Sequence, residues 1–227
     1  MEKTASQQFF SGVRDELPIL LGVIPFGMIY GILALSAGLD SLQAQAMSAI
    51  IFAGSAQFMT AQLIKTGTPA LVIIITGFVV NLRHALYSAS LAPYTRKLNA
   101  GWKALLSYLL TDEAYAVTIT RYQNEGAKAF THWYFFGAGL ALWTSWQIST
   151  AVGIFLGAQV PESWGLDFTL PLTFIALVVP ALKDRAGIVT AAVASLAALI
   201  FFGMPYKLGL IASALVAISV GLWMERK

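Results

Sequence analysis

The sequence predicts an all-α, polytopic membrane protein, a helical bundle with about eight membrane segments. Three observations predict this fold. Only 11% of the 227 residues are Asp, Glu, Lys or Arg, against about 25% in soluble globular chains. Hydrophobic residues make up 58% of the chain, and several uncharged runs approach or exceed the roughly 20 residues that a helix needs to cross a bilayer. These properties exclude a water-soluble enzyme, a nucleic-acid-binding protein and a disordered chain.

Charged residues divide the chain into its expected segments. The runs without Asp, Glu, Lys or Arg are 17–39, 41–64, 66–82, 84–95, 129–161, 168–182, 186–206 and 208–224. A further apolar stretch, 104–120, carries Asp112 and Glu113 in its middle. The run 129–161 would measure about 50 Å as one helix, too long for a single straight crossing. The first run follows Arg14, Asp15 and Glu16 and has no small-residue cleavage site, so we expect no removable signal peptide.

Some of these segments are short or interrupted. Pro25 lies inside the first run, and the short run 168–182 contains Pro171 and Pro180. Proline removes a backbone hydrogen bond from a helix, and short or broken helices are typical of transporter sites near the middle of the bilayer. We expect a single integral membrane domain over residues 1–227, built partly from broken helices.

The Lys and Arg residues favour a cytoplasmic N-terminus and a cytoplasmic C-terminus. Eight full crossings, however, would put the cluster Arg96, Lys97 and Lys103 on the outer side. If the segments 66–95 and 104–120 both dip into the membrane and return, this cluster moves inside. Eight crossings is the default prediction, and re-entrant segments within 66–120 are the alternative.

Three charged residues are expected at depth: Arg83, Asp112 and Glu113. A charged side chain at the bilayer centre costs about 2.5–3.5 kcal/mol even on the insertion scale, so such a residue is a functional candidate by default. Arg83 can neutralise one carboxylate, which leaves the other to bind a proton. His84 is a second group that can carry a proton near neutral pH. The alternative is that Arg83 and Asp112 only hold two helices together while Glu113 faces a wet crevice.

Neutral polar and small residues complete the candidate site. Gln57 needs hydrogen-bond partners at depth, and Gly54 and Ser55 precede it in a small-residue stretch that either packs against another helix or leaves room for a ligand. Asn81 is a further polar group beside Arg83. No metal site and no cofactor are expected, since the chain has no Cys, two His, and no Walker A or HExxH motif.

Three stretches resemble signatures of a known family. They are Phe52-Ala53-Gly54-Ser55-Ala56-Gln57-Phe58, Asn81-Leu82-Arg83-His84-Ala85-Leu86-Tyr87-Ser88-Ala89-Ser90-Leu91 and Leu110-Thr111-Asp112-Glu113-Ala114-Tyr115-Ala116. They are similar to stretches of the AzlC (YgaZ-type) proteins, the large subunits of bacterial branched-chain amino acid exporters, and the late stretches 168–171 and 180–183 are similar as well. The resemblance implies a multi-pass protein of the bacterial cytoplasmic membrane that exports valine, leucine, isoleucine or methionine. It also implies a separate, small AzlD-like hydrophobic subunit as partner.

The sequence therefore predicts a secondary transporter, with proton exchange as the expected coupling. An amino acid zwitterion needs an anion for its ammonium group, here Asp112 or Glu113, and a cation for its carboxylate, here Arg83. Gln57 and Asn81 would donate neutral hydrogen bonds, Gly54 and Ser55 would leave space for an apolar side chain, and Glu113 or His84 would carry the proton. There are three rival hypotheses. The first is a membrane-embedded enzyme that uses Arg83, His84, Asp112 and Glu113 for acid–base chemistry, with Ser55 or Ser88 as nucleophile. The other two are a passive channel and a structural subunit.

Overall fold

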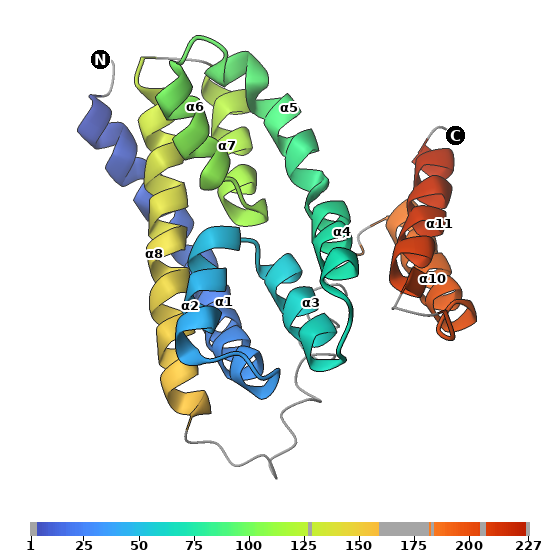
Figure 1. The fold of residues 1–227 in the computed structure, drawn as a ribbon. Coiled ribbons are helices and arrows are strands. Elements are labelled where there is room, and N and C mark those ends of the chain that lie inside the picture. The colour runs from blue at the N-terminus through green and yellow to red at the C-terminus, as the bar shows by residue number, and fades with distance from the viewer. Residues whose placement is uncertain (1–3, 127–128, 159–181, 183, 205–207, 226–227) are drawn as a thin grey trace. The chain divides into compact units, whose positions relative to one another are not determined.

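In the computed structural model the described residues, 4–126, 129–158, 182, 184–204 and 208–225, form helices and no strand. This confirms the predicted all-α membrane bundle. The chain divides into two compact units, unit 1 (Met1–Ala61 and Val80–Pro161) and unit 2 (Gln62–Val79 and Glu162–Lys227). Figure 1 labels the helices α1 (Ala5–Ser36), α2 (Ser41–Ile51), α3 (Gly54–Lys65), α4 (Ala70–Asn81), α5 (Arg83–Thr95), α6 (Ala100–Tyr108), α7 (Asp112–Glu125), α8 (Thr131–Gly157), α10 (Arg185–Ile200) and α11 (Leu208–Glu225).

Two long helices, α1 and α8, are the scaffold of unit 1 (Figure 1). Glycines let their backbones approach closely: a Cβ atom on Gly12 would lie 2.1 Å from the carbonyl oxygen of Tyr134, and one on Gly153 would lie 2.1 Å from that of Met28. The later residue of α1, Met28, contacts the later residue of α8, Gly153, so the two helices run in the same direction. At about 1.5 Å per residue, each helix is long enough to cross a bilayer.

A helical hairpin, α2 and α3, packs against one half of this scaffold. The side chain of Asp40 caps the start of α2 by accepting a hydrogen bond from the Gln43 N–H (2.7 Å). Phe52 ends α2 in a left-handed conformation, with φ 38°, a geometry that is uncommon for a residue other than glycine. The chain then reverses, and α3 begins at Gly54. The run 41–64, predicted as one segment, is thus two short antiparallel helices (Figure 1).

A second hairpin, α6 and α7, packs against the other half of α8. Asn99 caps α6 by accepting a hydrogen bond from the Trp102 N–H (2.9 Å), and the Thr111 hydroxyl caps α7 by accepting one from the Ala114 N–H (3.3 Å). At the other end of α7, the Tyr122 hydroxyl donates to the Thr131 carbonyl at the start of α8 (2.9 Å). The α6–α7 hairpin therefore approaches from the opposite end of α8 to the α2–α3 hairpin (Figure 1).

The tips of the two hairpins meet near the middle of α8. The Tyr108 hydroxyl, at the end of α6, donates to the carbonyl of Ala49 in α2. The indole Nε1 of Trp143 in α8 donates to the same hydroxyl (2.6 Å), and the rings of Phe52 and Tyr108 lie 5.9 Å apart. Trp143 thus anchors the tip contact to α8.

Residues Ala70–Thr95 form 26 residues of helix, long and apolar enough to cross a membrane, and are interrupted at Leu82 between α4 and α5. In unit 1, α5 runs beside α7 in the same direction: the Tyr94 and Tyr122 rings lie 4.9 Å apart, two turns beyond the contact of Tyr87 with Asp112. In unit 2, α10 and α11 pack together, and the Gly221 position faces Thr190.

The structure changes the expected topology of the chain's centre. By length and composition, three of the described helices can span a membrane: α1, the α4–α5 helix and α8. The segments that turn back are α2–α3 and α6–α7, so 104–120 is part of a hairpin but 66–95 is not. The single membrane domain over residues 1–227 stays a prediction. The predicted segment 168–182, with Pro171 and Pro180, falls outside the described residues apart from Leu182.

The close α1–α8 contact predicts a specific sensitivity to added volume. Gly153→Ala should lower the free energy of unfolding by about 1–3 kcal/mol, the usual cost of overpacking, because the new methyl group would overlap the Met28 backbone. Gly22→Ala on α1 is the matched control, since a Cβ atom at this position would have no neighbour within 4 Å. Thermal unfolding of the purified protein measures both, and equal midpoints for the two variants would contradict this packing.

Candidate functional site

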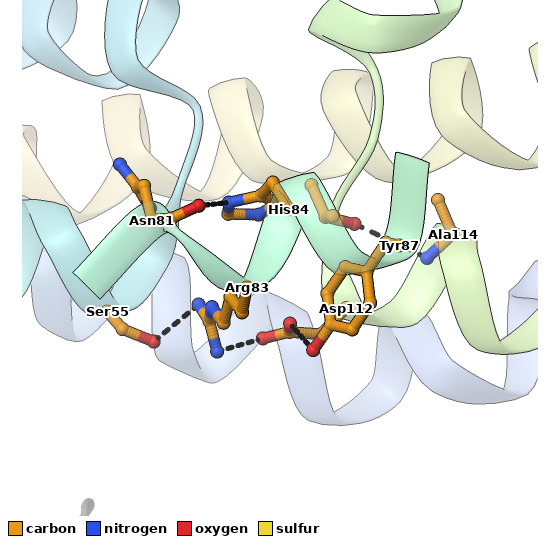
Figure 2. Close-up of polar contacts among 8 residues, drawn as sticks. Ser55, Asn81, Arg83, His84, Tyr87, Asp112 and Ala114 are labelled. Carbon is orange, nitrogen blue, oxygen red and sulfur yellow. Dashed lines mark hydrogen bonds and ion pairs between the residues drawn. The ribbon is translucent and has the colours of Figure 1, made fainter. Parts of the chain in front are cut away.

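Arg83, the first residue of α5, joins three elements at the hairpin tips (Figure 2). Its Nη1 lies 2.6 Å from Oδ2 of Asp112, the first residue of α7. Its Nη2 donates to the hydroxyl of Ser55, the second residue of α3 (3.0 Å). One guanidinium group therefore ties the starts of α3, α5 and α7 together.

Tyr87, one turn after Arg83 on α5, completes the polar contacts of Asp112. Its hydroxyl donates to Oδ1 of Asp112 (2.8 Å), and its ring stacks on that of Tyr115 with the centroids 4.3 Å apart. The Tyr115 hydroxyl donates to Ser90 (3.1 Å). Both carboxylate oxygens of Asp112 therefore have a partner. Tyr87 belongs to this contact although it was not among the predicted site residues.

The ion pair is partly accessible. The side chains of Arg83 and Asp112 are 31% and 37% exposed in this chain, so they do not form a sealed pair inside the bundle. This exposure leaves room for a ligand to approach both charges.

The other predicted polar residues, His84, Asn81 and Gln57, differ in burial and in their hydrogen-bond partners. His84 is half-buried, with its Nδ1 3.1 Å from the carbonyl oxygen of Asn81. The Oδ1 atom of Asn81 is buried with no hydrogen-bond partner among the described residues. Gln57 is 0% exposed, and neither of its amide atoms has a hydrogen-bond partner within the described part of the chain. Buried amides without partners are uncommon, because each unmade hydrogen bond costs free energy.

Glu113 and Gly54 lie on opposite hairpin tips. Glu113 is half-buried on α7 and interacts electrostatically with Asp112 and Arg83. Gly54 begins α3 and faces Trp146 of α8, whose Cη2 atom would lie 3.1 Å from a Cβ at this position. The structure therefore favours the packing interpretation for Gly54 itself. The other predicted residues, Ser55, Gln57, Asn81, Arg83, His84, Asp112 and Glu113, all belong to unit 1.

The two hairpin tips differ in charge. The first turn of α7 carries Asp112 and Glu113, whereas the first turn of α3 carries no acidic residue. The start of a helix has unpaired N–H groups and a partial positive charge that favours anions. The α3 tip with Arg83 is therefore electropositive, and the α7 tip is electronegative.

A cavity of about 310 Å³ lies beside the site, among α5, α6 and α8. Its lining includes Ser88, Arg96, Lys103, Ser107, Leu110 and Phe135. Arg96 and Lys103 lie where α5 ends and α6 begins, and Leu110 lies in the α6–α7 turn, two residues before Asp112. The cavity thus extends from the positively charged end of unit 1 toward the hairpin tip.

Comparison with known proteins identifies the family. The family model described as AzlC protein matches residues 18–160. The chain belongs to the AzlC family. This is a family of membrane transport proteins and not of enzymes. The match contains all three motifs that suggested the resemblance, so the resemblance is confirmed. The stretches 168–171 and 180–183 lie beyond the match. Apart from Leu182, they also lie outside the described residues.

The family includes bacterial and archaeal relatives of similar length. The inner membrane protein YgaZ of Escherichia coli (strain K12) is 28% identical over 228 residues, 96% of this chain and 93% of the relative. An uncharacterized membrane protein of Archaeoglobus fulgidus is 29% identical over 224 residues, 96% of each chain. The branched-chain amino acid transport protein AzlC of Bacillus subtilis (strain 168) is 29% identical over 200 residues, 86% of this chain and 77% of the relative. No solved structure matches the chain.

The contact between Arg83 and Asp112 predicts non-additive effects on stability. Arg83→Gln and Asp112→Asn should each destabilise the protein, and the double variant should be less damaging than the sum by about 0.5–3 kcal/mol, the range for residues in direct contact. Denaturant unfolding of the four proteins in detergent gives this coupling free energy. Additive effects would show that the pair contributes nothing to the fold.

Proposed function

We propose that this AzlC-family protein is a secondary transporter that exports branched-chain amino acids, with methionine as a further substrate, in exchange for protons. One observation carries the proposal: two helix starts of opposite charge, the α3 tip with Arg83 and the α7 tip with Asp112 and Glu113, meet where the two hairpin tips join. A zwitterion has the same two charges at a fixed short separation. The family of transport proteins and the name of the Bacillus subtilis relative support this interpretation.

Each pole of the site would bind one end of the amino acid. The carboxylate would accept hydrogen bonds from the Arg83 guanidinium and from the free N–H groups of the first turn of α3. The ammonium group would lie between Asp112 and Glu113. Ser55, Gln57 and Asn81 would supply neutral hydrogen bonds, and the apolar side chain would extend into the surrounding aromatic and aliphatic groups.

Proton exchange would use the acid that Arg83 does not neutralise. Arg83 pairs with Asp112 at 2.6 Å, so Glu113 is the carboxylate that needs another cation. His84 is the second candidate proton carrier, with its Nδ1 facing the Asn81 carbonyl. Nucleophilic chemistry would need a serine hydrogen-bonded to His84. Within the described part of the chain His84 instead contacts Asn81 and Ser55 contacts Arg83, which argues against the enzyme alternative.

The charge distribution supports a cytoplasmic position for the end of unit 1 where α1 begins. Arg14, Arg96, Lys97, Lys103 and Arg121 belong to that half of the unit. Asp40 is the charged residue at the turn between α1 and α2, at the opposite end. Because Lys and Arg favour the cytoplasmic side, the α6–α7 hairpin would enter from the cytoplasm and the α2–α3 hairpin from outside. The 310 Å³ cavity, with Arg96 and Lys103, would then be a cytoplasmic approach for the substrate carboxylate.

We further propose that the protein lies in the bacterial cytoplasmic membrane and works with a small AzlD-like hydrophobic subunit. The first part follows the name of the Escherichia coli relative. The second follows from the family resemblance. Transport experiments therefore use the chain together with this subunit.

Transport by variants tests the role of Arg83. In proteoliposomes, Arg83→Ala should weaken the binding of branched-chain amino acids at least about tenfold, since loss of a charge-assisted contact worth about 1.4 kcal/mol has this effect. Arg14→Ala removes an exposed cation of α1 and should leave export unchanged. Wild-type export by an inserted and assembled Arg83→Ala protein would remove Arg83 from the substrate site.

A second variant separates binding from proton coupling. Glu113→Gln should slow but not abolish exchange of labelled leucine across the membrane, because Asp112 still faces the ammonium group. It should lose accumulation driven by a pH gradient, because the amide cannot release a proton. A pH-dependent accumulation equal to that of the wild type would exclude Glu113 as the proton carrier and leave His84→Gln as the next variant to measure.

The proposed orientation is testable because the chain has no native cysteine. With a membrane-impermeant maleimide, Lys97→Cys should react only from the cytoplasmic side and Ser41→Cys only from the outer side; both positions are exposed. Eight full crossings would instead put both positions outside, so labelling of both from the outer side would contradict the hairpin topology.

A further inference from the structure

Glu16 is a buried carboxylate that the proposed transport site does not use. It lies on α1 and is 0% exposed. Neither Oε1 nor Oε2 has a hydrogen-bond partner among the residues that the structure describes. A buried ionised carboxylate without hydrogen bonds is very costly, so burial favours the protonated, neutral form of this side chain.

The sequence gives only a weak signal for this burial. Glu16 follows Arg14 and Asp15, which are exposed, and the three together suggest a charged segment outside the membrane. However, Gln8, Gly12 and Glu16 are spaced four residues apart and are all buried, which places them on one face of α1. Gly12 contacts the Tyr134 backbone, so this face of α1 packs against α8.

The ionisable neighbours of Glu16 connect it to the site. On α7, Glu113 interacts with it electrostatically. On α8, the charge of Glu16 also acts on Tyr134, whose hydroxyl donates to Oδ2 of Asp15 on α1 (2.8 Å). The Arg121 guanidinium of α7 lies 5.3 Å from the centre of the Tyr134 ring. Glu16 thus lies between Glu113 and the polar groups of Tyr134, Asp15 and Arg121, which are nearer the end of unit 1 at which α1 begins.

The depth of Glu16 agrees with this position. Gly12 of α1 is level with Tyr134 of α8, whereas the tip residue Leu109 is level with Gly139. Glu16, one turn beyond Gly12, therefore lies near the level of the α6–α7 tip.

We propose that Glu16 is a second proton-binding residue, in series with Glu113, through which a proton passes between the transport site and the side of the membrane at which α1 begins. In the transfer step the O–H bond of protonated Glu16 breaks and an O–H bond forms on the Glu113 carboxylate. Glu16 becomes the carboxylate, and the net charge of the two acids is unchanged. While either acid holds the proton, the two do not face each other as two anions. The inference rests on the proposed exchange of protons for amino acids.

Glu16→Gln keeps the shape of the side chain and removes its proton exchange. In proteoliposomes with the small subunit, exchange of labelled leucine without a pH gradient should stay within about twofold of the wild type. Accumulation driven by a pH gradient should fall about 100-fold, a typical effect of removing a proton-transferring group. Asp40→Asn, which changes an exposed acid at the other end of α1 and keeps an acceptor for the α2 cap, is the matched control and should keep both activities. Wild-type accumulation by Glu16→Gln, or loss of both activities in a folded protein, would overturn the proposal.

An infrared measurement separates this proposal from the proposed function. At neutral pH the wild-type protein should show the carbonyl stretch of a protonated carboxylic acid that is missing in Glu16→Gln and present in Asp40→Asn. Identical spectra for the wild type and Glu16→Gln would overturn the role of Glu16 whatever the substrate. Absence of any amino acid transport by the wild type, together with this band, would instead overturn the proposed function and leave Glu16 as a proton-binding site.

Discussion

Charge pairing between α5 and α7 is the constraint on which the centre of unit 1 depends. Arg83 and Asp112 lie where the hairpin tips meet, at the starts of α5 and α7. An unpaired charge among apolar membrane helices is costly, so the 2.6 Å contact fixes the start of α5 against the start of α7. The same guanidinium holds Ser55, which adds the start of α3. Three helix starts are thus positioned by one side chain.

Such a site requires helices that end inside the bundle, and the packing of α1 against α8 makes this possible. The two long helices run side by side with glycines at their contact, and together they offer one continuous surface. The short hairpins cover that surface from opposite ends, and their tips are joined by the Tyr108–Ala49 and Trp143–Tyr108 hydrogen bonds. Side chains at the helix ends make polar contacts across the tips, and such contacts help non-helical backbone to be tolerated inside a membrane protein.

The sequence predicted the membrane fold, the family and the identity of the central charges, because charge-free runs and buried charges are strong signals in a membrane chain. It did not predict the hairpins. The run 41–64 is apolar throughout, and its turn at Phe52 depends on a left-handed residue that is not glycine. The break before Asp112 did have a signal, since Thr111 followed by two acids is typical of a helix start. Glu16 was missed because charge alone suggested exposure, whereas only packing against α7 and α8 determines its burial.

The balance of charge explains why the proposed site would exchange substrate for protons. Arg83 neutralises one of two acids, so the empty site carries one acid more than it has bases and is most stable with one bound proton. The ammonium group of an amino acid brings the same positive charge to the same acids. In the proposed mechanism, proton and ammonium would therefore compete for Glu113, and each would favour release of the other. This competition is the thermodynamic requirement for exchange. Glu16 would give the released proton a second carboxylate to bind, away from the position of the substrate.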